Sequence, residues 1–240
     1  MAAAEGDLIV TDTTDTLDHA TAVTELLGAL AYGQLRAIEA AARLIAVAPD
    51  AATADLAADV VNHEFGAYRT LHDDLGSRTQ QPSEVMDGMK PFFDSYFDRA
   101  PLGDWFGCSV FFALGLPIAA DFARALAPVL DDDTAALVVE AIGGRERFEE
   151  AAAEQLRELL TDEEARSRAR QLAGDLLGRA LTSYQEAMGE TDALKVLFAA
   201  EAEAEGTTGE AQVKRLAMEV LTGHRRRTVA LGLEDLDEDL

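Results

Sequence analysis

Cysteine is nearly absent from this sequence. Cys108 is the only one among 240 residues, so no internal disulfide can form, and a reducing compartment is compatible with that composition. The chain also lacks a recognisable Ser/His/Asp set, a phosphate-binding glycine loop and a dinucleotide fingerprint. Cys108 has no basic residue beside it in the sequence, which favours a packed small residue over a nucleophile.

Basic residues are scarce as well. Twenty Lys and Arg stand against 45 Asp and Glu, for a formal net charge of −25. Tight, non-specific binding to nucleic acid needs Lys and Arg to displace the counterions of the phosphates. Nucleic acid is therefore not an expected partner, and the acidic surface is expected to keep the protein soluble.

Long hydrophobic runs are missing too. The longest, Val110–Ala120, is shorter than the roughly 20 residues that span a bilayer, and it contains Pro117. The first residues, Met1–Asp7, have neither the basic nor the apolar region of a signal peptide. We therefore expect a cytoplasmic protein with no membrane partner.

Apolar residues recur every three or four positions through most of the chain, with no sustained period-two run, which predicts an all-α fold. Four long helices are expected at 20–47, 53–75, 104–130 and 134–160. A long connection, 77–101, with a short helix inside it, separates the second from the third. Such a crossover favours a ferritin-like four-helix bundle, here with additional C-terminal helices. We expect a flexible segment at 1–18, one domain at 19–232 and an acidic tail at 233–240.

Each long helix carries a polar residue on or near its apolar stripe. These residues are Gln34 in the first, Glu64 in the second, Asp121 in the third, and Glu140 with Arg147 in the fourth. One such position per helix indicates a buried polar site in the bundle core. An unpaired carboxylate there would be costly, so Glu64 should have a cation, a proton or strong hydrogen bonds, unless it lies at the boundary and reaches water. His63 falls off the stripe and is expected to face the surface.

Several short segments, in this order and spacing, resemble one known family: Ala31–Leu35, Glu64–Tyr68, Met89–Phe92, Ala100–Trp105, Ile118–Phe122, Leu137–Glu140 and Ala230–Leu233. The chain is similar to actinobacterial MiaE-like proteins, which are ferritin-like relatives of the tRNA hydroxylases, over about residues 25–232. The resemblance implies a ferritin-like bundle and two irons that activate dioxygen. Its ligand pattern implies Glu in the first helix, Glu-x-x-His in the second and fourth, and an acid in the third.

This chain departs from that ligand pattern. Gln34 stands for the first Glu, Ala67 for the His after Glu64, and Gly144 with Arg147 for the last pair, while Asp121 keeps an acid. Two irons need several carboxylates and imidazoles, so we predict no metal cofactor. We expect Arg147 to pair with Glu64 or Asp121 across the core in place of the irons. The alternatives are iron held by unusual ligands, or a displaced metal site drawn from Glu39, His63, His72, Glu140 and Glu146.

Aromatic residues make up only 6% of the chain, but eight of them gather between 92 and 112. They indicate either core packing under a long loop or the wall of an apolar pocket beside the former metal site. For the pocket we expect contacts from Gln34, Tyr68, Phe93, Phe97, Trp105, Phe111 and Glu140. Gly115–Pro117 should loosen the third helix, and Gly143–Gly144 could leave a cavity in the fourth.

Three functions fit these patterns. The first is a metal-independent protein that binds a small apolar or aromatic molecule, with Glu64 or Asp121 as a base and Arg147 as an electrostatic stabiliser for acid–base chemistry. The second is a MiaE-like iron oxygenase with unusual ligands, although hydroxylation of tRNA does not suit the net charge. The third is a non-catalytic scaffold, and a homodimer is conceivable for any of them because the helix faces are rich in Ala.

Overall fold

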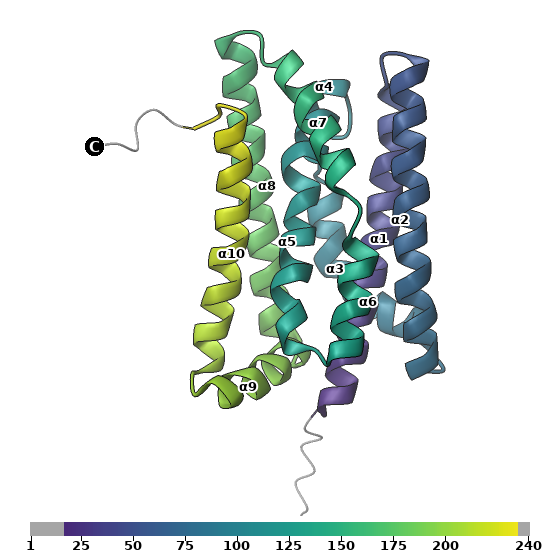
Figure 1. Ribbon diagram of the computed structural model, residues 1–240, viewed down its shortest axis with the longest axis vertical. Coiled ribbons are helices and arrows are strands. Elements are labelled where there is room, and N and C mark those ends of the chain that lie inside the picture. The colour runs from purple at the N-terminus through teal and green to yellow at the C-terminus, as the bar shows by residue number, and fades with distance from the viewer. Residues whose placement is uncertain (1–16, 235–240) are drawn as a thin grey trace, which may run out of the picture.

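The computed structural model describes residues 17–234, apart from the side chains of 200, 201 and 204, and this range is helical with no strand (Figure 1). The all-α prediction is confirmed. The predicted N-terminal segment 1–18 and acidic tail 233–240 fall almost wholly outside the described residues.

The first two helices form an antiparallel hairpin with extensive mutual contact. Helix α1 spans His19–Val47 and α2 spans Ala51–Arg78, close to the predicted bounds. Asp18 and Asp50 cap them by accepting hydrogen bonds from the backbone of residues three positions later. In Figure 1 this hairpin forms one side of the molecule, with α10 and α8 on the opposite side.

The connection between the second and third long helices contains α3, Pro82–Phe97, which continues through Pro91. The predicted short helix is therefore present, with 16 residues. It packs on α1 and on α8, so the crossover links the two sides of the bundle.

The third long helix is continuous but irregular. It begins as α4 (Trp105–Val110), widens into a π-helical turn η1 (Phe111–Gly115), and continues as α5 (Leu116–Leu126) and the 3₁₀ turn η2 (Ala127–Val129). Pro117 has no N–H to donate to the preceding turn, which accounts for the loosening expected there. This stretch is long and apolar enough to cross a membrane, but 83% of its most apolar window is buried within the protein. Its apolar character is therefore explained by its place in the core.

The fourth helix was predicted to be continuous, and that prediction is wrong. Helix α6 spans Asp132–Ile142 and α7 spans Glu146–Leu159, with a break at Gly143–Arg145 between them. Gly143 ends α6, and Gly144 adopts a left-handed φ of 74° that side chains other than glycine rarely adopt. The break changes which side chain enters the core.

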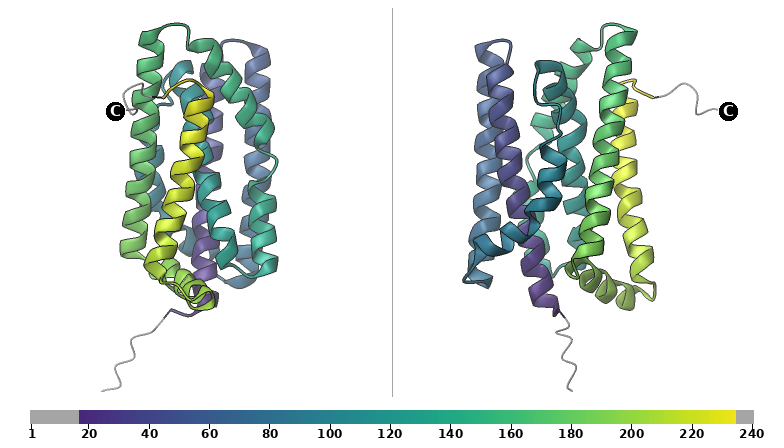
Figure 2. Two further views of the ribbon diagram at one scale, coloured as in Figure 1. Left: turned by 60° about the vertical axis from the view of Figure 1, so that its left-hand side comes forward. Right: turned by 180° about the vertical axis from the view of Figure 1, so that it is seen from behind.

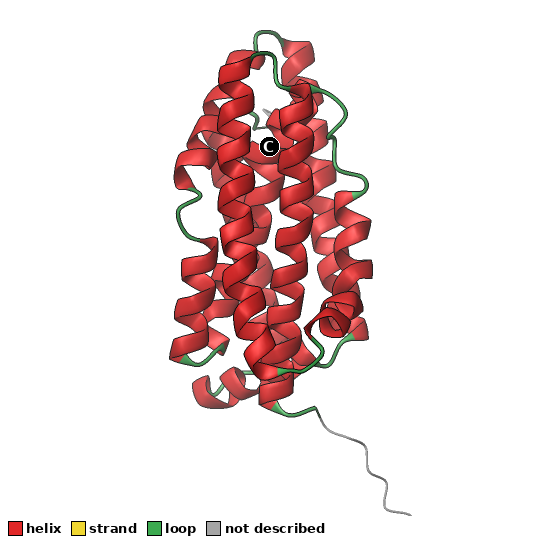
Figure 3. Cartoon of the chain, turned by 90° about the vertical axis from the view of Figure 1, so that its right-hand side faces the viewer, coloured by secondary structure: helices red, strands yellow, loops and turns green. Residues whose placement is uncertain are grey.

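The C-terminal third adds three helices: α8 (Glu163–Glu190), α9 (Ala193–Glu205) and α10 (Gly209–Ala230). Helix α8 packs on α3 and the π-helical turn, while α10 packs on α5 and α9. Figure 2 shows α9 lying across one end of the molecule, and Figure 3 shows the long helices running parallel to its long axis. The predicted bundle with additional C-terminal helices is confirmed.

Candidate functional site

Three polar side chains meet in the core between α1, α2 and the α6–α7 break. Gln34, Glu64 and Arg145 are 5%, 1% and 5% exposed. One nitrogen of the Arg145 guanidinium, Nη2, donates to Gln34 Oε1 at 2.8 Å and also to Glu64 Oε2. The buried charges therefore compensate each other, and the predicted burial of Gln34 and Glu64 is confirmed.

The arginine in this cluster is not the one that the sequence pattern indicated. Arg147 is exposed, and its guanidinium lies over the Phe148 ring at 4.3 Å from the centroid. The expectation that Arg147 pairs with Glu64 or Asp121 is therefore wrong. Because the chain leaves the helix at Gly143 and turns at Gly144, Arg145 precedes the first residue of α7 and its side chain enters the core.

Asp121 belongs to a second, separate cluster. It is 8% exposed, and its two oxygens accept hydrogen bonds from Arg227 at 2.6 Å and from Arg124 at 3.1 Å. Arg227 comes from α10, 106 positions further along the chain. The two carboxylates predicted for the core, Glu64 and Asp121, thus have different arginine partners.

A third carboxyl group, Glu149 of α7, lies between the two clusters. Its Oε1 is enclosed and has no hydrogen-bond partner among the described residues. Burial raises the pKa of the Glu149 carboxyl, while the charges of Arg124, Arg227 and Arg145 lower it by less. Glu149, Glu64 and Arg145 line a small cavity of about 40 Å³, which can hold a few water molecules.

We predict that Glu149→Gln stabilises the protein at neutral pH. A carboxyl whose pKa is raised on folding favours the folded state below its unfolded pKa, near 4.5, and this contribution is lost as the pH rises through the folded pKa. The stability of the variant should therefore match that of the wild type at low pH and exceed it increasingly as the pH rises. Urea unfolding across this pH range measures the difference, and a gap that does not change with pH would contradict the prediction.

His63, expected at the surface, is half-buried. Its ring lies 5.4 Å from that of Phe148, centroid to centroid, and its Nε2 is enclosed with no partner in the described part of the chain. Burial is the main reason why the pKa of His63 is lowered, so the neutral imidazole is favoured. Phe148 lies in the first turn of α7, just after the break at Gly144, and its contact with His63 is not revealed by the apolar stripe of α2.

A larger cavity of about 190 Å³ lies among α1, α3, α5, α6, α8 and α9. Its walls are mostly apolar. Gln34 and Arg145 are the two members of the buried polar cluster that also line this cavity. Arg145 lines both cavities and therefore stands between them. Glu64 and Glu149 line only the small cavity, and Asp121 lines neither of the two.

The aromatic residues predicted for a pocket divide into three groups. Phe93 and Phe97 line the large cavity, and Trp105 lines the small one. Phe111 is fully buried and packs edge-on against the rings of Phe97 and Phe112. Tyr68 contacts His72 and lines neither cavity, and Glu140 is exposed at the end of α6, so these two expected ligand contacts are not at the site. Tyr184, which no sequence pattern indicated, also lines the large cavity.

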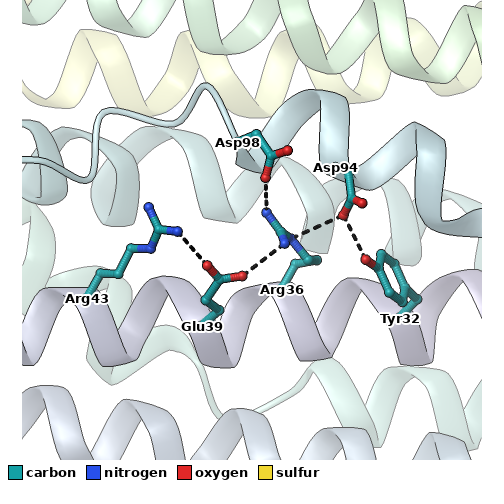
Figure 4. Close-up of polar contacts among 6 residues, drawn as sticks. All are labelled: Tyr32, Arg36, Glu39, Arg43, Asp94 and Asp98. Carbon is teal, nitrogen blue, oxygen red and sulfur yellow. Dashed lines mark hydrogen bonds and ion pairs between the residues drawn. The ribbon is translucent and has the colours of Figure 1, made fainter.

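A polar network holds the α3 wall of the large cavity against α1 (Figure 4). The Tyr32 hydroxyl donates to Asp94 at 2.7 Å, and Arg36 pairs with Asp98 and Asp94. Burial and the bond to Asp94 raise the pKa of Tyr32 to about 12. Close approach also needs Gly33, where a Cβ would lie 2.8 Å from the Phe93 ring. The aromatic side chains of α3 are therefore fixed over the cavity.

The residues present do not fit the two irons that the resemblance implied. The guanidinium of Arg145 lies between Glu64 and Gln34, where it supplies a fixed positive charge, and Asp121 is already paired with two arginines. Within residues 17–234, no three His, Cys, Asp or Glu are grouped closely enough to hold a metal ion, including the displaced set considered above. An ion pair and an amide do not form the carboxylate-rich donor set that two irons need.

A family model described as a ferritin-like domain of actinomycetes matches residues 18–201. The match begins at the cap of α1 and ends within α9, so α10, which supplies Arg227, lies outside it. Among curated proteins, none matches the chain. Since the family match covers more than half of the 240 residues and the helices form the expected bundle, this chain belongs to the family of actinomycete ferritin-like domains.

Proposed function

We propose that this protein binds a small apolar or aromatic molecule in the large cavity, and that its core works without a metal. The cavity carries the proposal: about 190 Å³ of mostly apolar space lies beside the buried Gln34–Arg145–Glu64 cluster. A cavity of roughly 150 Å³ accommodates benzene, so a substituted ring is the size of ligand that fits. On this proposal, Arg145 replaces the charge of the metal centre in a bundle of MiaE-like ancestry.

Binding is supported better than acid–base catalysis. The carboxylates that would serve as bases, Glu64 and Asp121, do not line the large cavity, and Arg145 separates Glu64 from it. Gln34 and Arg145 could stabilise a developing negative charge on a bound molecule. For a base, Glu149 has an oxygen with no partner, but it also lies on the far side of Arg145. A scaffold would be favoured by a core with no cavity, which is not the arrangement in the described residues.

A direct test titrates purified protein with indole and toluene as probes, followed by calorimetry and by NMR. We expect binding by the wild type and a loss of at least about tenfold in affinity for Ala29→Trp, which places an indole into the cavity wall. Ala58→Trp is the control, because Ala58 is exposed on α2 and should leave binding unchanged. If neither probe binds, or if Ala29→Trp binds as tightly as the wild type, the proposal is wrong.

The metal-free part of the proposal has its own measurement. Protein purified from iron-supplemented cells should contain far less than one iron per chain by mass spectrometry, and probe binding should survive treatment with a chelator. Two tightly held irons per chain would support the oxygenase alternative, because Arg145 would then have to leave the position between Glu64 and Gln34.

A further inference from the structure

The amide of Gln34 offers a directed hydrogen-bond donor to the large cavity. Its Oε1 accepts from Arg145 at 2.8 Å, which fixes the orientation of the amide and turns Nε2 the other way. Nε2 donates no hydrogen bond within residues 17–234. Unlike the enclosed unpartnered atoms of His63 and Tyr184, it retains accessible surface. Gln34 lines the large cavity and not the small one. The free N–H groups of Gln34 therefore face the space where a ligand would lie.

The charges around this donor select a neutral acceptor. Arg145 is already compensated by Glu64, so a bound anion would lose its hydration without meeting an uncompensated cation. A cation would be repelled by the partial positive charge of the Gln34 N–H groups, which offer it no hydrogen-bond acceptor. A hydroxyl group bound at Gln34 would bring a proton that needs an acceptor of its own, whereas a carbonyl oxygen brings only lone pairs. The carboxylate that lines this cavity, Glu25, stands nine positions earlier on α1, about 13 Å along the helix, too far to accept that proton directly. The wall is thus suited to a carbonyl oxygen.

We propose that the ligand of the large cavity is a small apolar carbonyl compound, such as an aryl ketone, aldehyde or ester, whose oxygen accepts a hydrogen bond from Gln34 Nε2. This inference rests on the proposed ligand-binding function and specifies its chemical class. The apolar part of the molecule lies among the side chains of α3, α5 and α8, and Phe93 and Phe97 contribute aromatic surface. Gln34, rather than a carboxylate, is then the residue that sets specificity.

The test compares two probes of nearly the same shape, acetophenone and α-methylstyrene, in which C=O is replaced by C=CH₂. One net hydrogen bond predicts that the wild type binds acetophenone about 2- to 10-fold more tightly. Gln34→Met should abolish this preference while keeping the affinity for α-methylstyrene. Gln155→Met is the matched control, because Gln155 lines only the small cavity, and it should keep the preference.

The outcomes separate the two proposals. If neither probe binds, the proposed function fails. If both bind equally well to the wild type, if Gln34→Met keeps the preference, or if benzoate binds more tightly than acetophenone, the cavity binds ligands but the carbonyl inference is overturned. A measurement that needs no variant is the infrared C=O stretch of bound acetophenone. It should move to lower frequency than in hydrocarbon solvent, and an unshifted band would overturn the inference even if Gln34→Met failed to fold.

Discussion

Arg145→Met is expected to lower the free energy of unfolding by about 3–5 kcal/mol, as measured by urea denaturation. Methionine fills a similar volume, so the main change is electrostatic. Glu64, only 1% exposed, would keep its carboxylate without the guanidinium that now binds it, and Gln34 Oε1 would lose its donor. An unpaired charge in that position is costly because little water can reach it.

Arg147→Met is the matched control, two residues further along the chain in the first turn of α7. Arg147 is exposed and contacts only the face of Phe148 among the interactions described for it, so its loss should cost no more than about 1 kcal/mol. The double variant Glu64→Leu/Arg145→Met should recover most of the stability, because it removes both charges together. Equal losses for Arg145→Met and Arg147→Met would show that Arg145 does not neutralise Glu64 in the core.

The burial of Gln34, Glu64 and Asp121 could be predicted because each lies on an apolar stripe of regular helical period, and the helices that carry them are unbroken at those positions. Periodicity needs only local geometry. The periodic pattern indicated the wrong arginine because it assumes one unbroken helix through Gly143 and Gly144. In the structure α6 ends there and the backbone turns. The turn at Gly144, with its positive φ, is why the predicted partner of Glu64 was Arg147 and the observed partner is Arg145, two residues earlier.

The sequence pattern could not predict the hydrogen-bond partners of the buried polar residues, or the cavities, for a different reason. Asp121 pairs with Arg227 over 106 positions, and Arg145 reaches Gln34 over 111. No helical period relates residues on separate helices, so the stripe on each helix shows that a polar group is buried without showing what it meets. The large cavity is lined by residues from six helices, and only its α3 aromatic wall was indicated by the clustering of Phe and Tyr along the chain.

The second large effect is expected at Asp121, which joins α10 to the part of the chain that the ferritin-like family shares. Asp121→Leu leaves Arg227, 15% exposed, without its carboxylate at the interface of α5 and α10. We expect a loss of about 2–4 kcal/mol in the free energy of unfolding, somewhat less than for Arg145 because these side chains are less enclosed. Asp73→Asn, in an exposed pair with Arg69, should change it by less than about 0.5 kcal/mol.

Hydrogen exchange can locate this loss. Helix α10 contacts α5, α9, α8 and the π-helical turn but neither α1 nor α2 to a significant extent, so it can detach without unfolding the hairpin. In Asp121→Leu, amides of Gly209–Ala230 should exchange faster than those of α1 and α2, whereas Arg145→Met should weaken protection in the hairpin as well. Uniform acceleration in Asp121→Leu would mean that α10 unfolds only with the whole bundle. The local result would show that Asp121 holds in place a helix that the family match does not include.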